Sequence, residues 1–436
     1  MALNIKESAA KMKQDSSKMA ALPLEVRNKA LIAAKAALKS QKEEIFAANK
    51  EDMDAADANG VTAAVKKRLK FDEHKLEDVL AGIDGLVSLP DPIGKLQLER
   101  QLDEGLVLKR VSCPIGVIGI IFEARPDALV QISSLCIKSG NCAILKGGKE
   151  TAKTNKVLFD IIYKAVTTAG LPENCLLQAE LHNEIDELLQ CHESVDLLIP
   201  RGSNAFVQYI MNNTKIPVMG HADGICHTYV DKDVDLDKML PVIVDAKTQY
   251  TAACNATETL LVHRDIAKEA LPKIAKALSD AKVKLRGTGE AADIINENDS
   301  LIDASDIMKE EDFNTEYLDM IISVKLVDNV DEAIAHINRF GSHHTDCILT
   351  ENDKTADYFM QLVDSAGVYQ NCSTRFADGF RYGFGAEVGI STGKIHARGP
   401  VGLEGLVTYK YKLVGHGHIV ADYASGKSQF NFRDLV

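Results

Sequence analysis

The stretch "VIGIIFEARPDALVQISSLCIKSGNCAILKGGKE", residues 117–150, decides the fold. Its apolar runs at 117–122 and 142–146 predict buried strands, and the pattern of residues 126–138 between them predicts a helix. The alternation continues to about residue 230, with strands expected at 175–180 and 195–200 and helices at 151–170, 183–190 and 204–213. This rhythm predicts right-handed βαβ units and a buried parallel sheet, a doubly wound Rossmann-type domain whose ligands collect at the carboxyl ends of the strands.

A second α/β region follows. Helices are expected at 236–253, 264–281, 330–338 and 352–364, and strands at 257–263, 320–327 and 346–350. The acidic segment 286–317 has little periodicity, so we expect a surface excursion there. The glycine-rich segment 379–406 predicts a long irregular segment, and such segments in enzymes are often functional. The fold class is therefore α/β with at least two domains.

Bulk properties exclude several classes of protein. A length of 436 residues suggests two or three domains. The net charge of −13 without a Lys/Arg block argues against nucleic-acid binding, and no apolar run is long enough to span a bilayer. The first 50 residues lack the features of a secretory signal and predict an amphipathic pair of surface helices in a cytoplasmic protein. The nine cysteines form no CxxC motif, so neither disulfides nor a structural metal is expected.

The segment "KTQYTAACNATETLL", residues 247–261, offers a candidate nucleophile. Cys254 lies between a predicted helix and a predicted strand, and the alanines before it leave room for a substrate. A thiolate at such a turn is a strong nucleophile, and nearby backbone N–H groups could receive an oxyanion. The alternative is a buried small thiol, and among nine cysteines the local pattern alone does not decide between them.

Two strand ends are candidate anion sites. "AILKGGKE" places Lys146 and Lys149 beside two glycines, where a nucleotide or a solvated loop would fit equally well. "DLLIPRGSNAF" places Gly202 and Ser203 before a helix, which predicts either phosphate binding or simple N-capping by Ser203. Neither pattern includes a complete GxGxxG or Walker motif.

Two further groups of polar residues allow opposite interpretations. Glu123 and Arg125 follow the first strand and are either site residues or an internal ion pair. His343 and His344 are adjacent but have no third ligand nearby in the sequence, so no metal site is predicted.

Several long strings in order resemble one known family. "GVIGIIFEARPDAL", "LKGGKE", "PRGSN", "YTAACNATETLL" and "HINRFGSHHTD" are similar to the aldehyde dehydrogenase superfamily, and the match extends from about Met1 to His418. The strings resemble in particular the branch that reduces the acyl phosphate of glutamate. This resemblance makes Cys254 the expected catalytic residue.

The resemblance implies a subunit of three parts. These are a dinucleotide-binding domain at 1–230, with a β-hairpin near 100–112, a catalytic domain at 231–395, and a return segment with a C-terminal strand at 396–436. Residues 106–110 and "VTYKYKLVG" would form a small β element for oligomerisation, which implies a homo-oligomer. Association with glutamate 5-kinase, which makes the acyl phosphate, stays open.

Matching positions imply the cofactor contacts. By this resemblance Lys146 contacts the adenosine ribose, Gly202 and Ser203 lie near the pyrophosphate, and Glu316 holds the nicotinamide ribose. Lys149 stands where members that prefer NAD often have a glutamate, and a cation there suits a 2′-phosphate. The expected cofactor is therefore NADPH.

Departures from the hydrolytic members imply the chemistry. No glutamate occurs from Ser194 to Thr257 to activate water, and Ala124 stands near the position of the usual oxyanion asparagine. The oxyanion is then expected to rest on backbone N–H groups at Cys254, with Asn255 or Arg125 as a further donor. The expected reaction is reduction of L-glutamyl 5-phosphate to L-glutamate 5-semialdehyde through a Cys254 thioester, the second step of proline synthesis from glutamate. The residues expected to bind the substrate are Arg125, Asn371, Arg375 and Arg398. The alternatives are an acylating dehydrogenase for another acyl phosphate or an acyl-CoA, and an inert nucleotide-binding scaffold.

Overall fold

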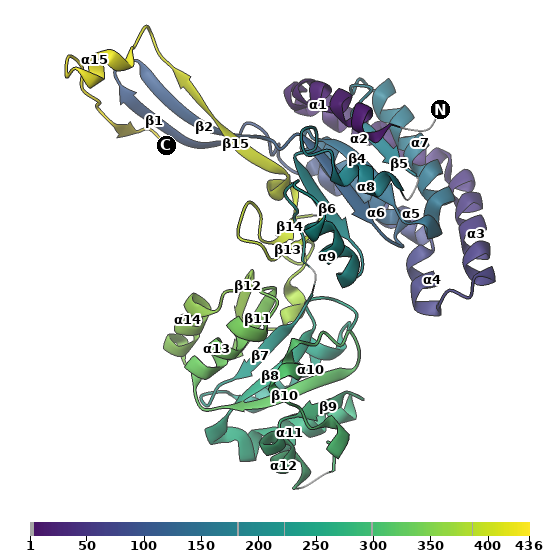
Figure 1. The fold of residues 1–436 in the computed structure, drawn as a ribbon, viewed down its shortest axis with the longest axis vertical. Coiled ribbons are helices and arrows are strands. Elements are labelled where there is room, and N and C mark those ends of the chain that lie inside the picture. The colour runs from purple at the N-terminus through teal and green to yellow at the C-terminus, as the bar shows by residue number, and fades with distance from the viewer. Residues whose placement is uncertain (1–3, 181–182, 222, 298–299, 386) are drawn as a thin grey trace. The chain divides into compact units, whose positions relative to one another are not determined.

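The computed structural model describes residues 4–180, 183–221, 223–297, 300–385 and 387–436. The chain forms two compact units (Figure 1). The first unit comprises residues 1–220, 384–389 and 401–436, and the second comprises residues 221–383 and 390–400. The chain therefore leaves the first unit after residue 220 and builds most of the second. It returns to the first unit for residues 384–389 and again from residue 401 onward.

The N-terminal segment is helical. Its elements are α1 (Ile5–Ala21), α2 (Leu24–Ser40), α3 (Lys42–Ala58), α4 (Ala63–Leu69) and α5 (Glu73–Ser88). The prediction of a helix pair in the first 50 residues is wrong, because three helices begin there. Pro23 lies at the N-cap of α2 and separates it from α1. These helices are also part of the core, since α1 buries Ile5, Met12 and Met19.

The first unit contains the sheet that residues 117–150 predict. Its strands are β3 (Val117–Phe122), β4 (Cys142–Gly147), β5 (Leu176–Ala179) and β6 (Leu197–Arg201), all parallel, in the order β5-β4-β3-β6. The helices are α6 (Pro126–Lys138), α7 (Ala152–Thr168), α8 (Asn183–Leu189) and α9 (Asn204–Asn212). The chain runs from β3 to β5 in one direction and then crosses to β6 on the other side of β3. The topological switch point, where such sheets bind ligands, thus lies between β3 and β6.

The second unit contains a six-stranded parallel sheet. Its strands are β7 (Cys226–Val230), β8 (Thr257–His263), β9 (Lys284–Gly287), β10 (Ile321–Val327), β11 (Thr345–Leu349) and β12 (Gly367–Gln370), in the order β12-β11-β7-β8-β10-β9. The helices are α10 (Leu236–Thr248), α11 (Ala267–Asp280), α12 (Gly289–Asn296), α13 (Val330–Phe340) and α14 (Asp353–Leu362).

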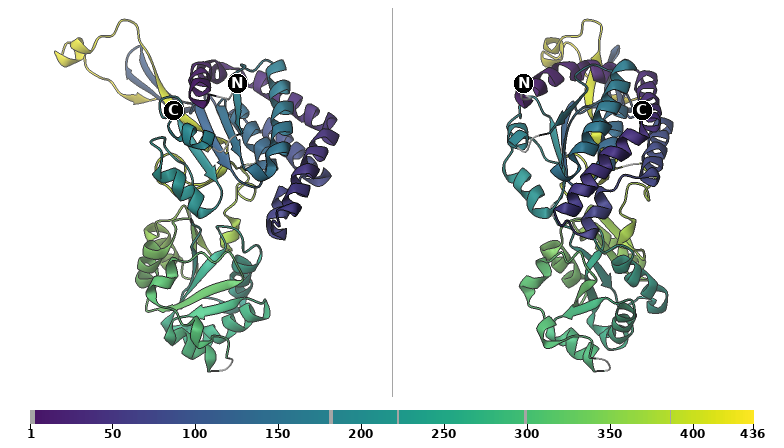
Figure 2. Two further views of the ribbon diagram at one scale, coloured as in Figure 1. Left: turned by 45° about the vertical axis from the view of Figure 1, so that its right-hand side comes forward. Right: turned by 90° about the vertical axis from the view of Figure 1, so that its right-hand side faces the viewer.

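Helices cover both faces of this sheet (Figure 2). Val230 and Leu260 pack into the cluster with α10, α11 and α12, whereas Tyr229 and Leu261 pack into the cluster with α13 and α14. Neighbouring residues of a strand point to opposite faces, so a strand buried on both sides is largely apolar. This explains the apolar run of β8 from Leu260 to Val262.

Three expectations about the second region need correction. The boundary lies at residue 220 rather than 230, because β7 pairs with β8 and β11 of the second sheet. The segment 286–317 is not merely a surface excursion, since it contains α12 and buries Ala291, Ile295 and Phe313. Helix α10 ends at Thr248 and not at residue 253, which leaves Cys254 in a turn.

A small antiparallel sheet belongs to the first unit. It comprises β1 (Leu96–Asp103), β2 (Leu106–Pro114), β15 (Val407–Val414) and β16 (Arg433–Asp434), in the order β15-β2-β1-β16, and α15 (Val420–Ala424) follows β15. The predicted hairpin and C-terminal strand are thus confirmed as elements, and their role in oligomerisation stays a prediction. The glycine-rich segment is largely irregular apart from β13 (Gly389–Ser391), β14 (Gly399–Val401) and short 3-10 turns. None of the helices in the described part of the chain is both long and apolar enough to span a membrane.

Candidate active site

Cys254 lies in the turn between α10 and β8. The Ala256 N–H donates to the Ala253 carbonyl at 2.9 Å and closes the turn. The Cys226 thiol donates to the Cys254 carbonyl oxygen at 3.2 Å, and Gly224 lies against the Cys254 backbone. A Cβ atom at position 224 would lie 2.2 Å from the Cys254 oxygen and 2.5 Å from its Cβ, so only glycine fits. Cys226 and Gly224 therefore both contact the backbone of Cys254 and fix the position of its half-buried thiol.

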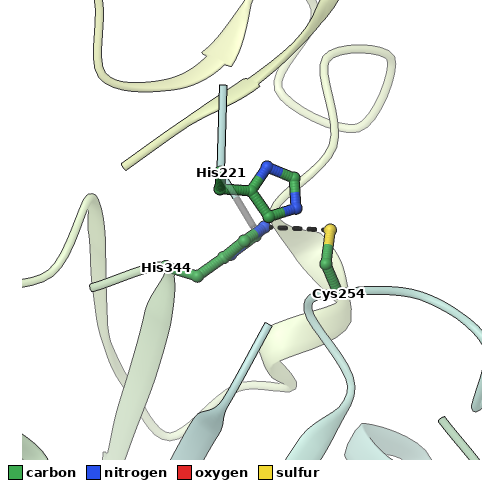
Figure 3. A group of neighbouring side chains, drawn as sticks. All are labelled: His221, Cys254 and His344. Atoms are coloured by element: carbon green, nitrogen blue, oxygen red, sulfur yellow. Dashed lines mark hydrogen bonds between the residues drawn. The ribbon is translucent and has the colours of Figure 1, made fainter. Parts of the chain in front are cut away.

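His344 contacts the thiol of Cys254 (Figure 3). Its Nε2 atom lies 3.1 Å from the Cys254 Sγ, and its Nδ1 atom lies 2.9 Å from the Thr345 Oγ1. The register of the sheet brings the two residues together, because Cys226 pairs with Thr257 and the parallel strands β7, β8 and β11 begin at the same edge. The site thus lies at the amino edge of the second sheet, whereas the cofactor residues were predicted at carboxyl ends. This contact could not be predicted from the sequence, in which His344 lies two residues before a predicted strand.

A second histidine stands beside this pair. The Nδ1 atom of His221 lies 3.0 Å from the Ile390 carbonyl oxygen, and its ring meets the His344 ring edge to face at 5.1 Å. The neighbouring His343 is turned to a different partner, with its Nδ1 atom 2.6 Å from the Asp364 carbonyl oxygen. His221 carried no motif in the sequence, and only the fold identifies it.

Asn255 and Arg375 lie close to Cys254. The Asn255 amide nitrogen donates to the Ala377 carbonyl at 2.8 Å, and its buried Oδ1 atom has no partner among the described residues. The Arg375 Nε donates to the Gln249 Oε1 at 3.0 Å. Burial lowers the pKa of Arg375 and Arg381 lowers it further, while the charge of Cys254 acts in the opposite direction. Arg375 is thus near enough to Cys254 for their charges to interact.

Two of the expected substrate residues have structural partners. The Asn371 amide donates to the Thr350 carbonyl at 2.8 Å and accepts from the Thr350 N–H at 2.9 Å, which uses both of its polar atoms. Arg398 forms an ion pair with Asp364 at 3.0 Å and also donates to the Asp364 carbonyl. These contacts account for Asn371 without a substrate, whereas the buried Nε atom of Arg398 has no partner among the described residues.

A buried ion pair lies behind the Cys254 turn. The Lys247 Nζ and the Glu258 Oε2 are 2.7 Å apart, and both side chains are fully buried. Burial raises the pKa of Glu258 to about 7, against the effect of Lys247, and the charge of Glu316 raises it further. Glu258 also accepts from the Leu318 N–H at 3.3 Å. Glu316, the expected nicotinamide-ribose residue, is therefore in a half-buried loop near this pair.

The expected cofactor residues of the first unit gather at the carboxyl edge of its sheet. Phe122 pairs with both Gly147 and Arg201, so the segments that follow β3, β4 and β6 emerge side by side. Lys146 is buried, its Nζ donates to the Gly147 carbonyl at 2.7 Å, and burial lowers its pKa. Lys149 is exposed on the segment after β4.

The switch point between β3 and β6 is bridged by a carboxylate. The Ser203 N–H donates to the Glu123 Oε2 at 3.0 Å, and a Cβ atom at Gly202 would lie 2.6 Å from the same oxygen. Glu123 therefore bonds to the helix N-terminus rather than forming the internal pair with Arg125, which is exposed. Ser203 is at the N-cap of α9, but within the described structure its side chain makes no capping bond.

Comparisons with known proteins show similarity to one family along the length of the chain. The model of the "Aldehyde dehydrogenase family" matches residues 2–295. The chain is 54% identical over 433 residues to a gamma-glutamyl phosphate reductase of Acetivibrio thermocellus, covering 99% of each chain. It is 55% identical over 415 residues to one of Ruminiclostridium cellulolyticum, covering 95% of this chain and 94% of the other.

A solved structure shows the same fold. The crystal structure of gamma-glutamyl phosphate reductase from Thermotoga maritima superposes with a TM-score of 0.92 at 37% identity, covering 96% of this chain and 100% of that one. An acetylating aldehyde dehydrogenase from Geobacillus thermoglucosidasius, at 16% identity and a TM-score of 0.63, shares the fold. The chain therefore belongs to the aldehyde dehydrogenase family, and within that family its full-length similarity is to the gamma-glutamyl phosphate reductases.

Proposed function

We propose that this chain reduces L-glutamyl 5-phosphate to L-glutamate 5-semialdehyde and phosphate, with Cys254 as the nucleophile. The full-length similarity to gamma-glutamyl phosphate reductases supports the substrate. The observation that carries the chemistry is the 3.1 Å contact between the His344 Nε2 and the Cys254 Sγ. The reaction is the second step of proline synthesis from glutamate.

The first step is attack of Cys254 on the acyl phosphate. His344 accepts the thiol proton at Nε2, and the thiolate forms a bond to the acyl carbon while the carbon–oxygen bond to phosphate breaks. The product is a Cys254 thioester, and phosphate leaves without the help of an activated water. The neighbouring glutamate, Glu258, does not activate water because it is fully buried in the pair with Lys247.

The second step is reduction of the thioester. A bound nicotinamide cofactor would provide the hydride for this step, and backbone N–H groups of the Cys254 turn stabilise the oxyanion that forms at the acyl carbon. The bond from carbon to Sγ then breaks, which releases the aldehyde and restores the thiolate. Asn255 supports this turn through the Ala377 carbonyl. Arg375, near Cys254, is the side chain that we assign to an anionic group of the substrate. Arg125 is a further candidate for binding an anionic group of the substrate. We assign Asn371 and Arg398 to positioning the loops of the site through their bonds to Thr350 and Asp364.

The cofactor is a nicotinamide dinucleotide, as membership of the family indicates, and we assign NADPH. Lys146 and the Gly202–Ser203 turn would hold the adenosine side, with Glu316 at the nicotinamide ribose. The carboxyl edge of the sheet in the first unit fits an anionic ligand, because Lys146, Lys149 and the N-terminus of α9 lie there. Glu123 occupies the Ser203 N–H, so a pyrophosphate at that amide requires the carboxylate to move away.

The reverse reaction tests this proposal, because the acyl phosphate is labile. Reduction of NADP⁺ is followed with glutamate 5-semialdehyde and phosphate, in the unaltered protein, in Cys254→Ala and in the control Cys113→Ala. We expect formation of NADPH that depends on phosphate and is lost only in Cys254→Ala. Activity without phosphate would show a hydrolytic enzyme. Activity that needs coenzyme A would show the related acylating enzyme, and no activity with any acceptor would favour an inert scaffold.

A further inference from the structure

Three side chains at the candidate active site offer ligand atoms to one point. The group consists of His221, Cys254 and His344, and its ligand atoms all lie within 4.8 Å of one another. The residues come from three separate segments: the first residue of the second unit, the turn before β8, and the residue before β11. Figure 3 shows the distal ring nitrogens of both histidines pointing toward the sulfur.

The proximal nitrogens of both histidines are bonded to oxygen. The Ile390 carbonyl can only accept, so the His221 Nδ1 at 3.0 Å must carry the proton. The His344 Nδ1 has the Thr345 Oγ1 at 2.9 Å. A histidine fixed in this way presents the lone pair of Nε2, and ligands of protein metals almost always have such an oxygen partner. These contacts orient both rings independently of the thiol.

The donor set selects the kind of metal. Two imidazoles and a thiolate suit Zn²⁺, whereas Mg²⁺ and Ca²⁺ require oxygen ligands. Bond lengths of about 2.3 Å to sulfur and about 2.0 Å to nitrogen place tetrahedral ligand atoms about 3.3–3.6 Å apart. The observed 3.1 Å between the His344 Nε2 and the Cys254 Sγ is close to this spacing, and all the ligand atoms lie within 4.8 Å of one another, so the site needs only a limited closure around an ion. Three protein ligands leave a fourth position for water.

We propose that His221, Cys254 and His344 bind one Zn²⁺ ion and that this binding reversibly inhibits the protein. The ion replaces the proton of the Cys254 thiol, which passes to solvent, and bonds to the sulfur lone pair that would attack a substrate. Binding of the ion rests on the geometry alone. The inhibition rests in addition on the proposed function, in which Cys254 is the nucleophile.

Titration of the full-length, metal-free protein with Zn²⁺ tests the binding without reference to activity. Calorimetry should give one ion per chain, and X-ray absorption should show one sulfur and two nitrogen ligands. Co²⁺ in the same site should give a charge-transfer band from the thiolate. Cys254→Ala should lose the band and the site. His221→Asn and His344→Asn should each weaken binding by at least the 10–100-fold that loss of an outer-shell partner costs.

His343→Asn is the matched control, because asparagine tolerates the positive φ of 60° at this position. It should bind Zn²⁺ like the unaltered protein, and thermal unfolding should confirm that all variants are folded. Binding that survives in Cys254→Ala, or that is equally strong in His221→Asn, would overturn the proposal. If the protein binds Zn²⁺ but has no reductase activity, only the proposed function fails. If it is active but neither binds Zn²⁺ nor is inhibited by it, only the metal site fails.

Discussion

The Nε2 atom of His344 lies 3.1 Å from the Sγ atom of Cys254, although ninety residues separate the two in the chain. A base at this distance can accept the thiol proton as the sulfur attacks. His344→Asn should therefore lower kcat/KM by about 100-fold or more, the range of general base catalysis. Alkylation of Cys254 by iodoacetamide should slow in parallel. The neighbour His343→Asn should change neither rate, and equal effects of the two substitutions would contradict the assignment.

Substitution of Gly224 should impair catalysis, because this glycine packs directly against the backbone of Cys254. A methyl group at this position would lie 2.2 to 2.5 Å from backbone and Cβ atoms of Cys254, so Gly224→Ala must displace the turn. A displacement of about 1 Å can cost about 100-fold in rate, and we expect a loss of kcat/KM of that size. Gly289→Ala, where nothing lies within 4 Å, is the control. Unchanged kinetics in Gly224→Ala would show that the turn tolerates this shift.

Lys149 should decide the preference for the 2′-phosphate. It is exposed after β4, at the edge where the adenosine side is proposed to bind. Hydrogen bonds to charged groups contribute about 1.5–3 kcal/mol, so Lys149→Glu should raise the KM for NADPH at least about tenfold while the KM for NADH changes little. Lys164→Glu, an exposed site farther along α7, controls for the change in net charge. A parallel rise for both cofactors would remove Lys149 from the recognition of the phosphate.

The buried pair Lys247–Glu258 should be far more costly to break than to replace. Both side chains are fully buried, so Lys247→Met leaves the Glu258 carboxylate without its partner. Removal of one partner of such a pair costs about 3–5 kcal/mol, whereas replacement of both by apolar residues is often nearly neutral. Urea unfolding of Lys247→Met and of the double variant Lys247→Met/Glu258→Leu measures the difference. Equal losses in the two variants would mean that packing, rather than the unpaired charge, sets the cost.

His336 should make the protein sensitive to acid. Burial lowers the pKa of this histidine to about 2, and the charges of His227, Lys325 and Arg339 contribute in the same direction. The unfolded chain binds the proton near pH 6.5 while the folded chain does not, so the contribution is complete above pH 6.5 and stability is lost as the pH falls below it. The loss is at most about 1.4 kcal/mol per pH unit.

Substitution of His336 should therefore flatten this dependence. His336→Phe keeps a ring between Phe313 and Phe340, whose centroids lie 4.8 and 4.7 Å away, and removes the titrating group. The free energy of unfolding, measured at pH 7 and pH 5, should fall less in this variant than in the unaltered protein. The exposed His192→Gln should behave like the unaltered protein. The same acid loss in His336→Phe would assign the effect to other groups.

The sequence by itself determined the parallel sheets and singled out Cys254 as the candidate nucleophile. The strands predicted at 117–122 and 257–263 have the expected bounds, because burial on both faces favours successive apolar residues such as those of 117–122 and 260–262. Cys254 stood out because a long motif surrounds it. The apolar runs and the motif around Cys254 are both local patterns, so they can be recognised without knowledge of the fold. Helix α12 within the acidic segment was missed because it is only 8 residues long, although its buried residues Ala291, Ala292 and Ile295 have helical spacing.

The tertiary structure alone decided which distant residues meet. β7 joins the second sheet because it pairs with β8 and β11, which no local pattern records. The shared starting edge of these parallel strands places His344 on Cys254, and the chain entering β7 adds His221. Contacts with Thr350 and Asp364 likewise use Asn371 and Arg398 within the structure. The physical reason is that strand register and side-chain partners depend on residues far apart in the sequence, whereas the pattern of apolar residues depends on neighbours.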